Sequence, residues 1–359
     1  MRGYFRNYGC RLLEFELFGY RTIALENEFL RVTVLADKGA CIYELLHKPS
    51  DTDFLWRWER GLRPRGYVES SPHPSGNFQE HFAGGWDEMF PIFGGQAVIG
   101  GLPIGYHGEV ACNPWEYVIQ QDDAEEIAVQ FSVRTVRTPF RLTRTLRLRR
   151  RSTTLSISEA VTNEAPAALT FLWGHHPCFG PPFLGPHCRI DSGARRTSAY
   201  RRDAYERGRI AVEDQVAAWP HLKGRDGKPV DLSRILGSEA GVSDCFYLTD
   251  FDDPAWCAVT NFAAGVGIAL AWTREVMPCA LVWQGFGGDE AAPWWGRAYT
   301  LAIEPLSSCP MGYADALRLG TARKLEPGTS LSFKMTATAY SAAKGIRAVS
   351  AEGGIEPIM

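Results

Sequence analysis

Apolar residues at every second position are the feature of this sequence that most constrains its fold. Successive side chains of an extended strand point to opposite faces, so this alternation indicates strands with one buried face. The pattern is clear over residues 30–34, 127–133 and 331–339. Short apolar runs bounded by Gly, Pro or charge predict three further strands, over residues 265–271, 280–286 and 299–303.

A long hairpin is predicted over residues 141–163. Two runs of alternating apolar side chains are separated there by Arg149, Arg150 and Arg151. A phosphate or polyanion patch is one interpretation of this basic run. Because charge runs are more often solvated ends of elements, we interpret it as the hairpin tip.

Helical signals are few. We expect an excursion over residues 198–218 to contain a helix, and residues 231–236 and 313–319 to form a turn or two of helix each. Many short strands with few helices predict an all-β fold, a sandwich or a barrel. No linker-like change of composition occurs, which favours a single domain over residues 1–359. Residues 341–359 lose the alternation, and we expect a loosely held tail there.

The charge balance excludes some partners. The chain has 38 Lys and Arg against 41 Asp and Glu, a formal net charge of −3, whereas a general nucleic-acid binder carries a strongly basic surface. No apolar run approaches the ~18 residues of a membrane span. We therefore expect neither nucleic acid nor a membrane as partner. Nine cysteines without a Cys-x-x-Cys pair indicate reduced thiols in a cytoplasmic protein.

Several common catalytic signatures are missing. The sequence has no Gly-x-x-x-x-Gly-Lys-Ser/Thr loop, no Gly-x-Gly-x-x-Gly after a strand, no His-Glu-x-x-His and no Gly-x-Ser-x-Gly. Nucleotide handling, zincin chemistry and serine hydrolysis are therefore disfavoured.

Two histidine segments are candidates for a functional site. His175 and His176 follow an apolar strand and precede Pro177, and His107 lies in a glycine-rich turn. Each could instead be a hydrogen-bonded packing residue. Adjacent residues of a strand point to opposite faces, so only one of His175 and His176 would normally enter a given site. This geometry disfavours a metal site built from all three histidines.

Glu304 is a carboxylate at the end of an otherwise apolar segment. Pro305 follows it, and a proline disturbs regular strand pairing. Glu304 is therefore either an exposed strand end or a site residue.

Several of these segments occur together in one known family. The chain resembles the aldose 1-epimerases of the galactose mutarotase-like superfamily from residue 25 to about residue 340. The resemblance rests on motifs in the order and spacing seen there: Gly-Gly-Trp-Asp-Glu-Met-Phe-Pro at 84–91, His107-Gly108 followed by Pro114-Trp115, Val-Thr-Asn at 161–163, His-His-Pro-x-Phe at 175–179, Ser-Asp-Cys-Phe at 243–246 and Ile-Glu-Pro at 303–305.

The resemblance implies a large antiparallel β-sandwich and an isomerase that interconverts the α and β anomers of a sugar. By similarity, His176 takes the position of the general acid, Glu304 that of the general base, and His107 assists at the ring oxygen. The resemblance further implies that Asp244 binds sugar hydroxyls. Trp86, Asp87, Trp173 and His175 are further candidates for contact with the sugar.

The expected chemistry needs no metal and no cofactor, because one acid and one base suffice to open and close the ring. With ordinary pKa values of about 4.3 and about 6.5, the Glu304 carboxyl would be ionised and the His176 imidazole partly protonated at neutral pH.

Two alternatives stay open. In the related hexose-6-phosphate epimerases an arginine four residues after the first motif histidine helps to hold phosphate, whereas this chain has Ala111 there. A noncatalytic carbohydrate-binding protein is the other alternative, and the presence of His107, His176 and Glu304 together disfavours it. The sequence names neither the sugar nor the oligomeric state, monomer or homodimer.

Overall fold

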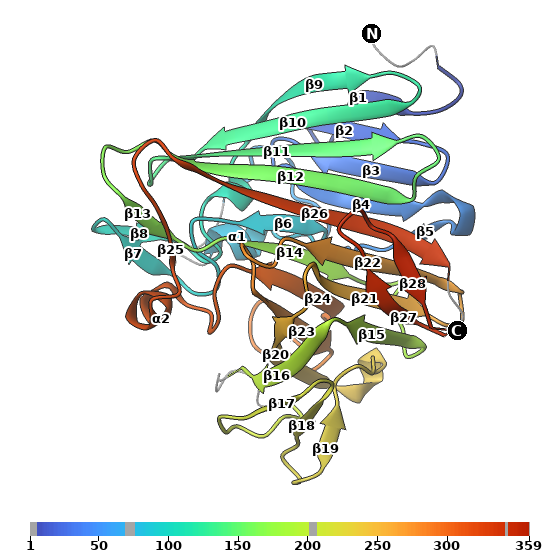
Figure 1. The fold of residues 1–359 in the computed structure, drawn as a ribbon, viewed down its shortest axis with the longest axis vertical. Helices are drawn as coiled ribbons and strands as arrows, with labels where there is room; N and C mark the ends of the chain where they lie inside the picture. The colour runs from blue at the N-terminus through green and yellow to red at the C-terminus, as the bar shows by residue number, and fades with distance from the viewer. Residues whose placement is uncertain (1–5, 69–75, 201–206, 342–343, 359) are drawn as a thin grey trace. The chain divides into compact units, whose positions relative to one another are not determined.

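The computed structural model describes residues 6–68, 76–200, 207–341 and 344–358. Strands dominate this part of the chain, and the two α-helices in it, α1 (Gly76–His81) and α2 (Tyr313–Leu319), are short (Figure 1). The predicted all-β class is confirmed. The chain divides into two compact units: the first comprises Met1–Asp53, Arg57–His176 and Ser307–Met335, and the second Phe54–Trp56, Pro177–Leu306 and Thr336–Met359. The single domain expected from the sequence stays a prediction.

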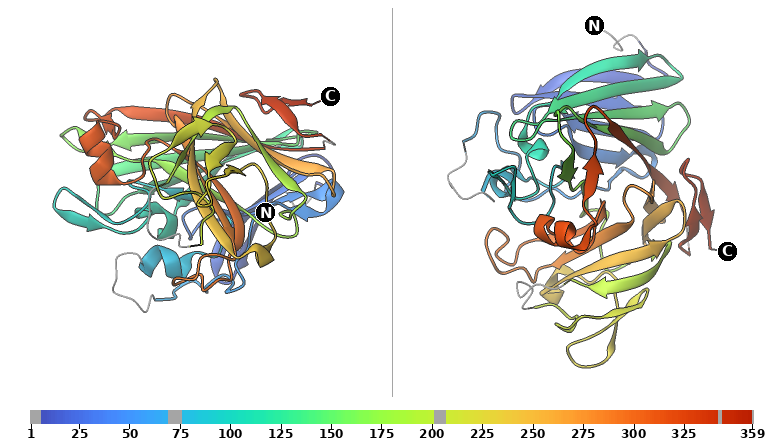
Figure 2. Two further views of the ribbon diagram at one scale, coloured as in Figure 1. Left: turned by 90° about the horizontal axis from the view of Figure 1, so that it is seen from below. Right: turned by 60° about the vertical axis from the view of Figure 1, so that its left-hand side comes forward.

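The first unit contains two antiparallel sheets. One sheet contains, in spatial order, β1 (Arg11–Leu17), β2 (Tyr20–Glu26), β3 (Leu30–Leu35), β4 (Cys41–His47) and β6 (Trp86–Met89). The other contains β9 (Glu116–Asp122), β10 (Glu126–Arg134), β11 (Phe140–Arg149) and β12 (Thr154–Asn163), which lie side by side in Figures 1 and 2. Short elements complete this unit: β5 (Thr52–Asp53), β7 (Ala97–Ile99), β8 (Leu102–Ile104), β13 (Leu169–Phe171), β25 (Arg323–Leu325), and the 3-10 helices η1 (Lys48–Ser50) and η2 (Val110–Cys112).

The second unit also contains two antiparallel sheets. One contains, in spatial order, β17 (Val216–Ala218), β16 (Ala194–Ala199), β20 (Val242–Phe251), β23 (Cys279–Phe286) and β24 (Tyr299–Leu306). The other contains β15 (Cys188–Ser192), β21 (Ala255–Asn261) and β22 (Val266–Trp272). Further elements are β18 (His221–Lys223), β19 (Pro229–Asp231), η3 (Ser238–Ala240), β27 (Ile346–Val349) and β28 (Ile355–Pro357). The chain passes from the first unit into the second within β14 (Gly174–Phe179) and β26 (Ser330–Ser341).

The structure has a strand over every segment for which the sequence predicts one, and α2 confirms the helix expected at 313–319. The long hairpin is β11 and β12, with Leu142 opposite Val161. At its tip Arg149 pairs with Glu126, and Arg150 pairs with Glu125 and Glu28. These ion pairs support the interpretation of the basic run as a solvated hairpin end.

The other two helix predictions, at 231–236 and within 198–218, are not confirmed. No helix forms at residues 231–236, because Asp231 ends β19 and its Oδ1 atom accepts hydrogen bonds from the backbone N–H and the hydroxyl of Ser233. Such a side-chain turn competes with helix formation. Of the excursion at 198–218, the structure shows the end of β16 and all of β17, while residues 201–206 lie outside the described residues.

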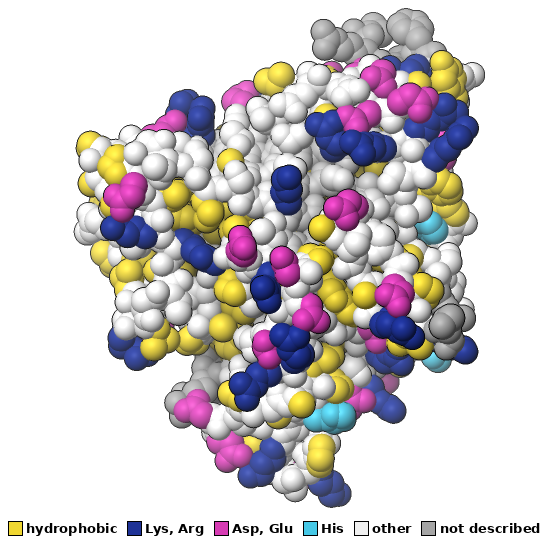
Figure 3. All heavy atoms as spheres, viewed as in Figure 1, with side chains coloured by type: hydrophobic (Ala, Val, Ile, Leu, Met, Phe, Trp, Pro, Cys, Tyr) yellow, Lys and Arg dark blue, Asp and Glu magenta, His cyan; other side chains and the backbone are white. Residues whose placement is uncertain are grey.

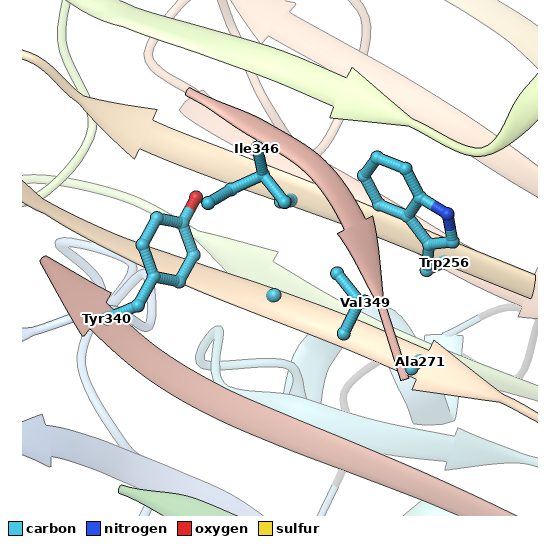
Figure 4. Close-up of a cluster of buried hydrophobic side chains, with 7 residues drawn as sticks. Trp256, Ala271, Tyr340, Ile346 and Val349 are labelled. Carbon is cyan, nitrogen blue, oxygen red and sulfur yellow. The ribbon is translucent and has the colours of Figure 1, made fainter. Parts of the chain in front are cut away.

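The C-terminal residues pack on the second unit, which corrects the loosely held tail expected from the sequence. Strands β27 and β28 form a hairpin, drawn in red beside the C label in Figure 2. Ile346 and Val349 of β27 join a buried apolar cluster with Trp256 of β21 and Tyr340 of β26 (Figure 4). The Ile346 N–H also donates to Asp191 Oδ2, 2.9 Å away. The hairpin is too short for its alternation to be recognised in the sequence.

Charged side chains of both signs are interspersed on the face seen in Figure 3, in keeping with the near balance of acids and bases. All nine cysteines are free thiols, and seven of them are buried. In the described part of the chain, no helix is long and apolar enough to cross a membrane.

The packed C-terminus gives a prediction about stability. We expect Ile346→Ala to lower the free energy of unfolding by about 2–5 kcal/mol, the range for truncating a buried aliphatic side chain. Ile358→Ala is the matched control, because Ile358 is exposed and its truncation should change stability by less than about 0.5 kcal/mol. Urea unfolding measures both. Equal effects of the two variants would mean that the hairpin is loosely held.

Candidate functional site

The side chains of His175 and His176 lie in different surroundings, because neighbouring residues of strand β14 point to opposite faces. The His176 ring lies in an aromatic group of the first unit, with its centroid 5.2 Å from that of His107 and 5.3 Å from that of Phe82. Phe78 contacts the His107 ring edge-on at 4.6 Å. The structure thus brings together His107 and His176, two of the three catalytic residues predicted from the sequence.

The glycine-rich turn determines how His107 is presented. The backbone N–H of Gly94 donates to His107 Nδ1 over 3.0 Å, so a neutral His107 carries its proton on Nε2. His107 has a positive φ of 60°, and Gly108 follows with a φ of 86°. A Cβ atom on Gly108 would lie 2.1 Å from the carbonyl oxygen of Phe90, so only glycine fits there.

A buried ion pair lies beside His176. Lys38 Nζ is 3.0 Å and 3.3 Å from the two carboxylate oxygens of Asp87, and both side chains are buried. Burial lowers the pKa of His176 to about 4, with Asp87 opposing and Lys38 adding to this shift. His176 is therefore neutral at pH 7, which corrects the expectation of a partly protonated imidazole. Asp87, predicted to contact sugar, is held by Lys38.

His175 belongs to a buried polar network on the other face of β14. Its Nδ1 atom accepts from Trp86 Nε1 over 3.2 Å, and its Nε2 atom is 3.0 Å from Glu159 Oε2. Because Nδ1 accepts, the ring proton lies on Nε2 and is donated to Glu159. Both ring nitrogens of His175 are thus bonded within the protein, and His175 is placed to hold the strand rather than to contact sugar.

Arg144 of β11 is the cation of this network. It donates to Glu88 of β6 and, over 2.7 Å, to Glu159 of β12, and it also donates to the carbonyl oxygen of Ala40 over 2.8 Å. Trp173 Nε1 donates to the second Glu88 oxygen over 2.6 Å. Burial and the neighbouring Glu159 raise the pKa of Glu88.

Two tryptophans predicted to contact sugar take part in this network. Trp86 and Trp173 are 1% and 0% exposed, and each uses its indole N–H within the network. Neither presents an indole face on which a sugar could stack. The structure therefore places Trp86 and Trp173, like His175, in the packed interior.

Glu304 lies in the second unit, on β24. The strand does not end at Glu304, as the sequence suggested, but continues to Leu306. Glu304 is 2% exposed and pairs across the sheet with Leu281 of β23. Burial raises its pKa well above the ordinary value, because the apolar surroundings disfavour the carboxylate.

Asp244 projects from the opposite face of the same sheet. It pairs with Gln284, whereas Glu304 pairs with Leu281, and an odd number of positions along β23 separates these two partners. The Asp244 carboxylate accepts from the backbone N–H of Arg209 over 2.7 Å and from Arg209 Nε over 2.5 Å. Asp244 therefore anchors the segment that contains Arg209, and its role in binding sugar hydroxyls stays a prediction.

Sequence reasoning missed the side chains that do share the face of Glu304. Trp283 lies two positions along β23 from Leu281 and therefore points to the same side of the sheet as Glu304. Its Nε1 atom donates to Asp289 Oδ2 over 2.9 Å. The alternation within β23 indicates the face of Trp283, but only the pairing of β23 with β24 shows that this is also the face of Glu304.

Removing Arg144 tests the buried network. Arg144→Leu would leave Glu88 and Glu159 without their shared cation, and we expect the free energy of unfolding to fall by about 3–5 kcal/mol. Arg147→Leu, in the same strand, is the control, since Arg147 pairs at the surface with Glu126 and should contribute less than about 1 kcal/mol. Urea unfolding distinguishes them, and a small effect of Arg144→Leu would contradict the network.

Comparisons with known proteins identify a family and a shared fold. The chain belongs to the family described as a domain of unknown function, DUF4432, whose model matches residues 18–339. No curated protein matches it significantly.

Solved structures match the fold over most of the chain at low identity. A protein from Klebsiella pneumoniae, described as a candidate aldose 1-epimerase, superposes with a TM-score of 0.71 at 17% identity over 90% of this chain and 80% of that chain. A galactose mutarotase-like protein from Clostridium acetobutylicum gives a TM-score of 0.64 at 13% identity over 93% and 99% of the two chains. The chain therefore has the large antiparallel β-sandwich fold of galactose mutarotase-like proteins, as predicted.

Proposed function

We propose that this protein is an aldose 1-epimerase, an isomerase that interconverts the α and β anomers of a free or modified aldose. The observation that carries the proposal is the pair of His107 and His176, whose ring centroids are 5.2 Å apart, on the face of β14 opposite the structural His175. The fold supports it, because solved proteins described as mutarotase-like share it. Fold alone does not establish activity, so the proposal rests on the site.

The proposed reaction opens and recloses a hemiacetal ring. One group removes the proton from the O1 hydroxyl while another delivers a proton to the ring oxygen, so the bond between C1 and the ring oxygen breaks and C1 becomes an aldehyde. The chain rotates about the C1–C2 bond, and the ring closes on the other face of C1. The group that gave a proton in opening must take one in closing. We assign these two roles to His176 and Glu304, with His107 assisting at the ring oxygen through its Nε2 proton.

The pKa shifts of His176 and Glu304 bear on which of the two gives the first proton and which accepts it. The resemblance assigns Glu304 as base and His176 as acid, yet burial favours the neutral form of each, a protonated Glu304 and an unprotonated His176. We therefore propose that the single transferable proton rests on Glu304 before sugar binds, with His176 as the first acceptor. The two groups exchange roles when the ring closes.

Substitutions of the pair test the assignment. We expect Glu304→Gln and His176→Ala each to lower kcat about 10²- to 10⁴-fold, the usual contribution of a positioned acid or base. Exchange NMR between anomers, run over a panel of free aldoses and sugar phosphates, measures the rate. Asp250→Asn is the control, since Asp250 pairs with Arg195 at the surface and its loss should leave kcat unchanged.

The outcomes separate the alternatives. Full activity of Glu304→Gln would overturn the acid–base pair. Turnover of sugar phosphates alone would favour a hexose-6-phosphate epimerase. A panel on which the wild-type protein binds sugar without interconverting anomers would favour a carbohydrate-binding protein.

The pH profile gives a second test. The active pair holds one proton, so kcat/KM falls when His176 gains a proton and also when Glu304 loses its own. Because the pKa of His176 is lowered to about 4, the acidic limb should lie near pH 4 rather than near the ordinary value of about 6.5 for histidine. Stopped-flow polarimetry from pH 3.5 to pH 9 measures the profile. An acidic limb near pH 6.5 would contradict the neutral His176.

A further inference from the structure

A group of three tryptophans lies on the second unit around the Glu304 face of its sheet. Trp283, which shares that face with Glu304, has its ring centroid 5.0 Å from that of Trp294 and 6.4 Å from that of Trp56. Trp56 and Trp294 are themselves 6.1 Å apart. Trp56 and Trp283 are buried, whereas Trp294 is only partly buried. The cluster therefore ends in an indole that solvent can reach.

The loop between β23 and β24 holds Trp294 in a fixed position. The Trp294 N–H donates to the carbonyl oxygen of Ala291 over 2.9 Å, and the Gly296 N–H donates to that of Asp289 over 2.7 Å. Gly287 N–H closes the base of the loop on the carbonyl oxygen of Ala298 over 2.9 Å. A loop with this much internal bonding presents its side chains with little entropy left to lose on binding.

Asp289 lies at the base of the same loop. Its Oδ2 atom accepts from Trp283 Nε1 over 2.9 Å, so the tryptophan cluster orients the carboxylate. Burial raises the pKa of Asp289, while hydrogen bonding with Ser243 and Trp283 acts against this shift. Asp289 as a residue is only partly buried.

An oriented carboxylate beside an accessible indole suits one class of ligand. Ligand sites combine aromatic walls with a few placed polar groups, and an indole offers a large apolar face. A pyranose matches this combination, because one side of its ring is a row of C–H groups and its edge carries hydroxyl donors. A carboxylate accepts from hydroxyls and repels phosphate, sulfonate or carboxylate substituents.

We propose that Asp289 and Trp294 form a sugar-binding wall on the Glu304 face, in which Asp289 accepts hydrogen bonds from hydroxyls and Trp294 packs on the C–H face of the ring. The wall selects neutral sugars over those with an anionic group at the hydroxyls that Asp289 contacts. This inference rests on the proposed function for the reaction, but the binding it describes can be measured without turnover.

The test compares two variants with two neighbours in the same loop. We expect Trp294→Ala and Asp289→Asn to weaken binding of the best neutral aldose about 10- to 100-fold, and to raise KM more than they lower kcat. A hydrogen bond to a charged group is worth about this much, and so is the burial of an aromatic face. Trp295→Ala and Glu290→Gln are the controls, because Trp295 is 64% exposed and Glu290 pairs with Arg207 at the surface. Isothermal titration calorimetry and saturation-transfer NMR measure binding.

The outcomes separate this inference from the proposed function. If the wild-type protein interconverts anomers and both variants keep its KM, the proposed sugar-binding wall is wrong and the proposed epimerase function holds. If the wild-type protein binds aldoses without turnover and both variants lose that binding, the proposed sugar-binding wall holds and the proposed epimerase function is wrong. Equal losses in the controls, or no binding of any neutral aldose by the wild-type protein, would overturn the wall. Recovery of binding in Asp289→Glu but not in Asp289→Asn would support the role of the carboxylate.

Discussion

The placement of His175 and His176 in the first unit depends on the buried guanidinium of Arg144. Arg144 of β11 bonds to Glu88 of β6 and to Glu159 of β12, and so connects the two sheets of that unit through their interior. Glu159 in turn holds His175 of β14. Because strand geometry directs neighbouring residues to opposite faces, fixing His175 on one face fixes His176 on the other, beside His107. The placement of the candidate acid–base group thus follows from an ion network that does no chemistry itself.

In the second unit, the register of strand pairing decides on which face of the sheet each side chain lies. A shift of one residue along β23 decides whether a side chain lies on the same face as Glu304 or on the opposite face, since side chains alternate with a period of two. Asp244 falls on the far face and becomes an anchor for Arg209, whereas Trp283 falls on the near face and orients Asp289. The register thus decides which carboxylate anchors a neighbouring segment and which one is oriented by Trp283.

Burial gives the candidate acid and base an unusual resting state. An ordinary pair at pH 7 would be an ionised glutamate and a partly protonated histidine. Here burial lowers the pKa of His176 to about 4 and raises that of Glu304, so the surroundings favour the neutral form of each group. A neutral pair avoids the cost of burying two charges and still has one proton to transfer.

The sequence by itself determined the strands with clear alternation or a bounded apolar run, the long hairpin and helix α2, because alternation and turn residues act between positions close together in the chain. It also singled out His107, His176 and Glu304. Only the tertiary structure decided that Trp86, Trp173 and His175 belong to the interior network, that Asp244 faces away from Glu304, and that the C-terminal residues pack as a hairpin. These outcomes depend on which distant strands pair and in which register, and a local pattern carries no information about its partner.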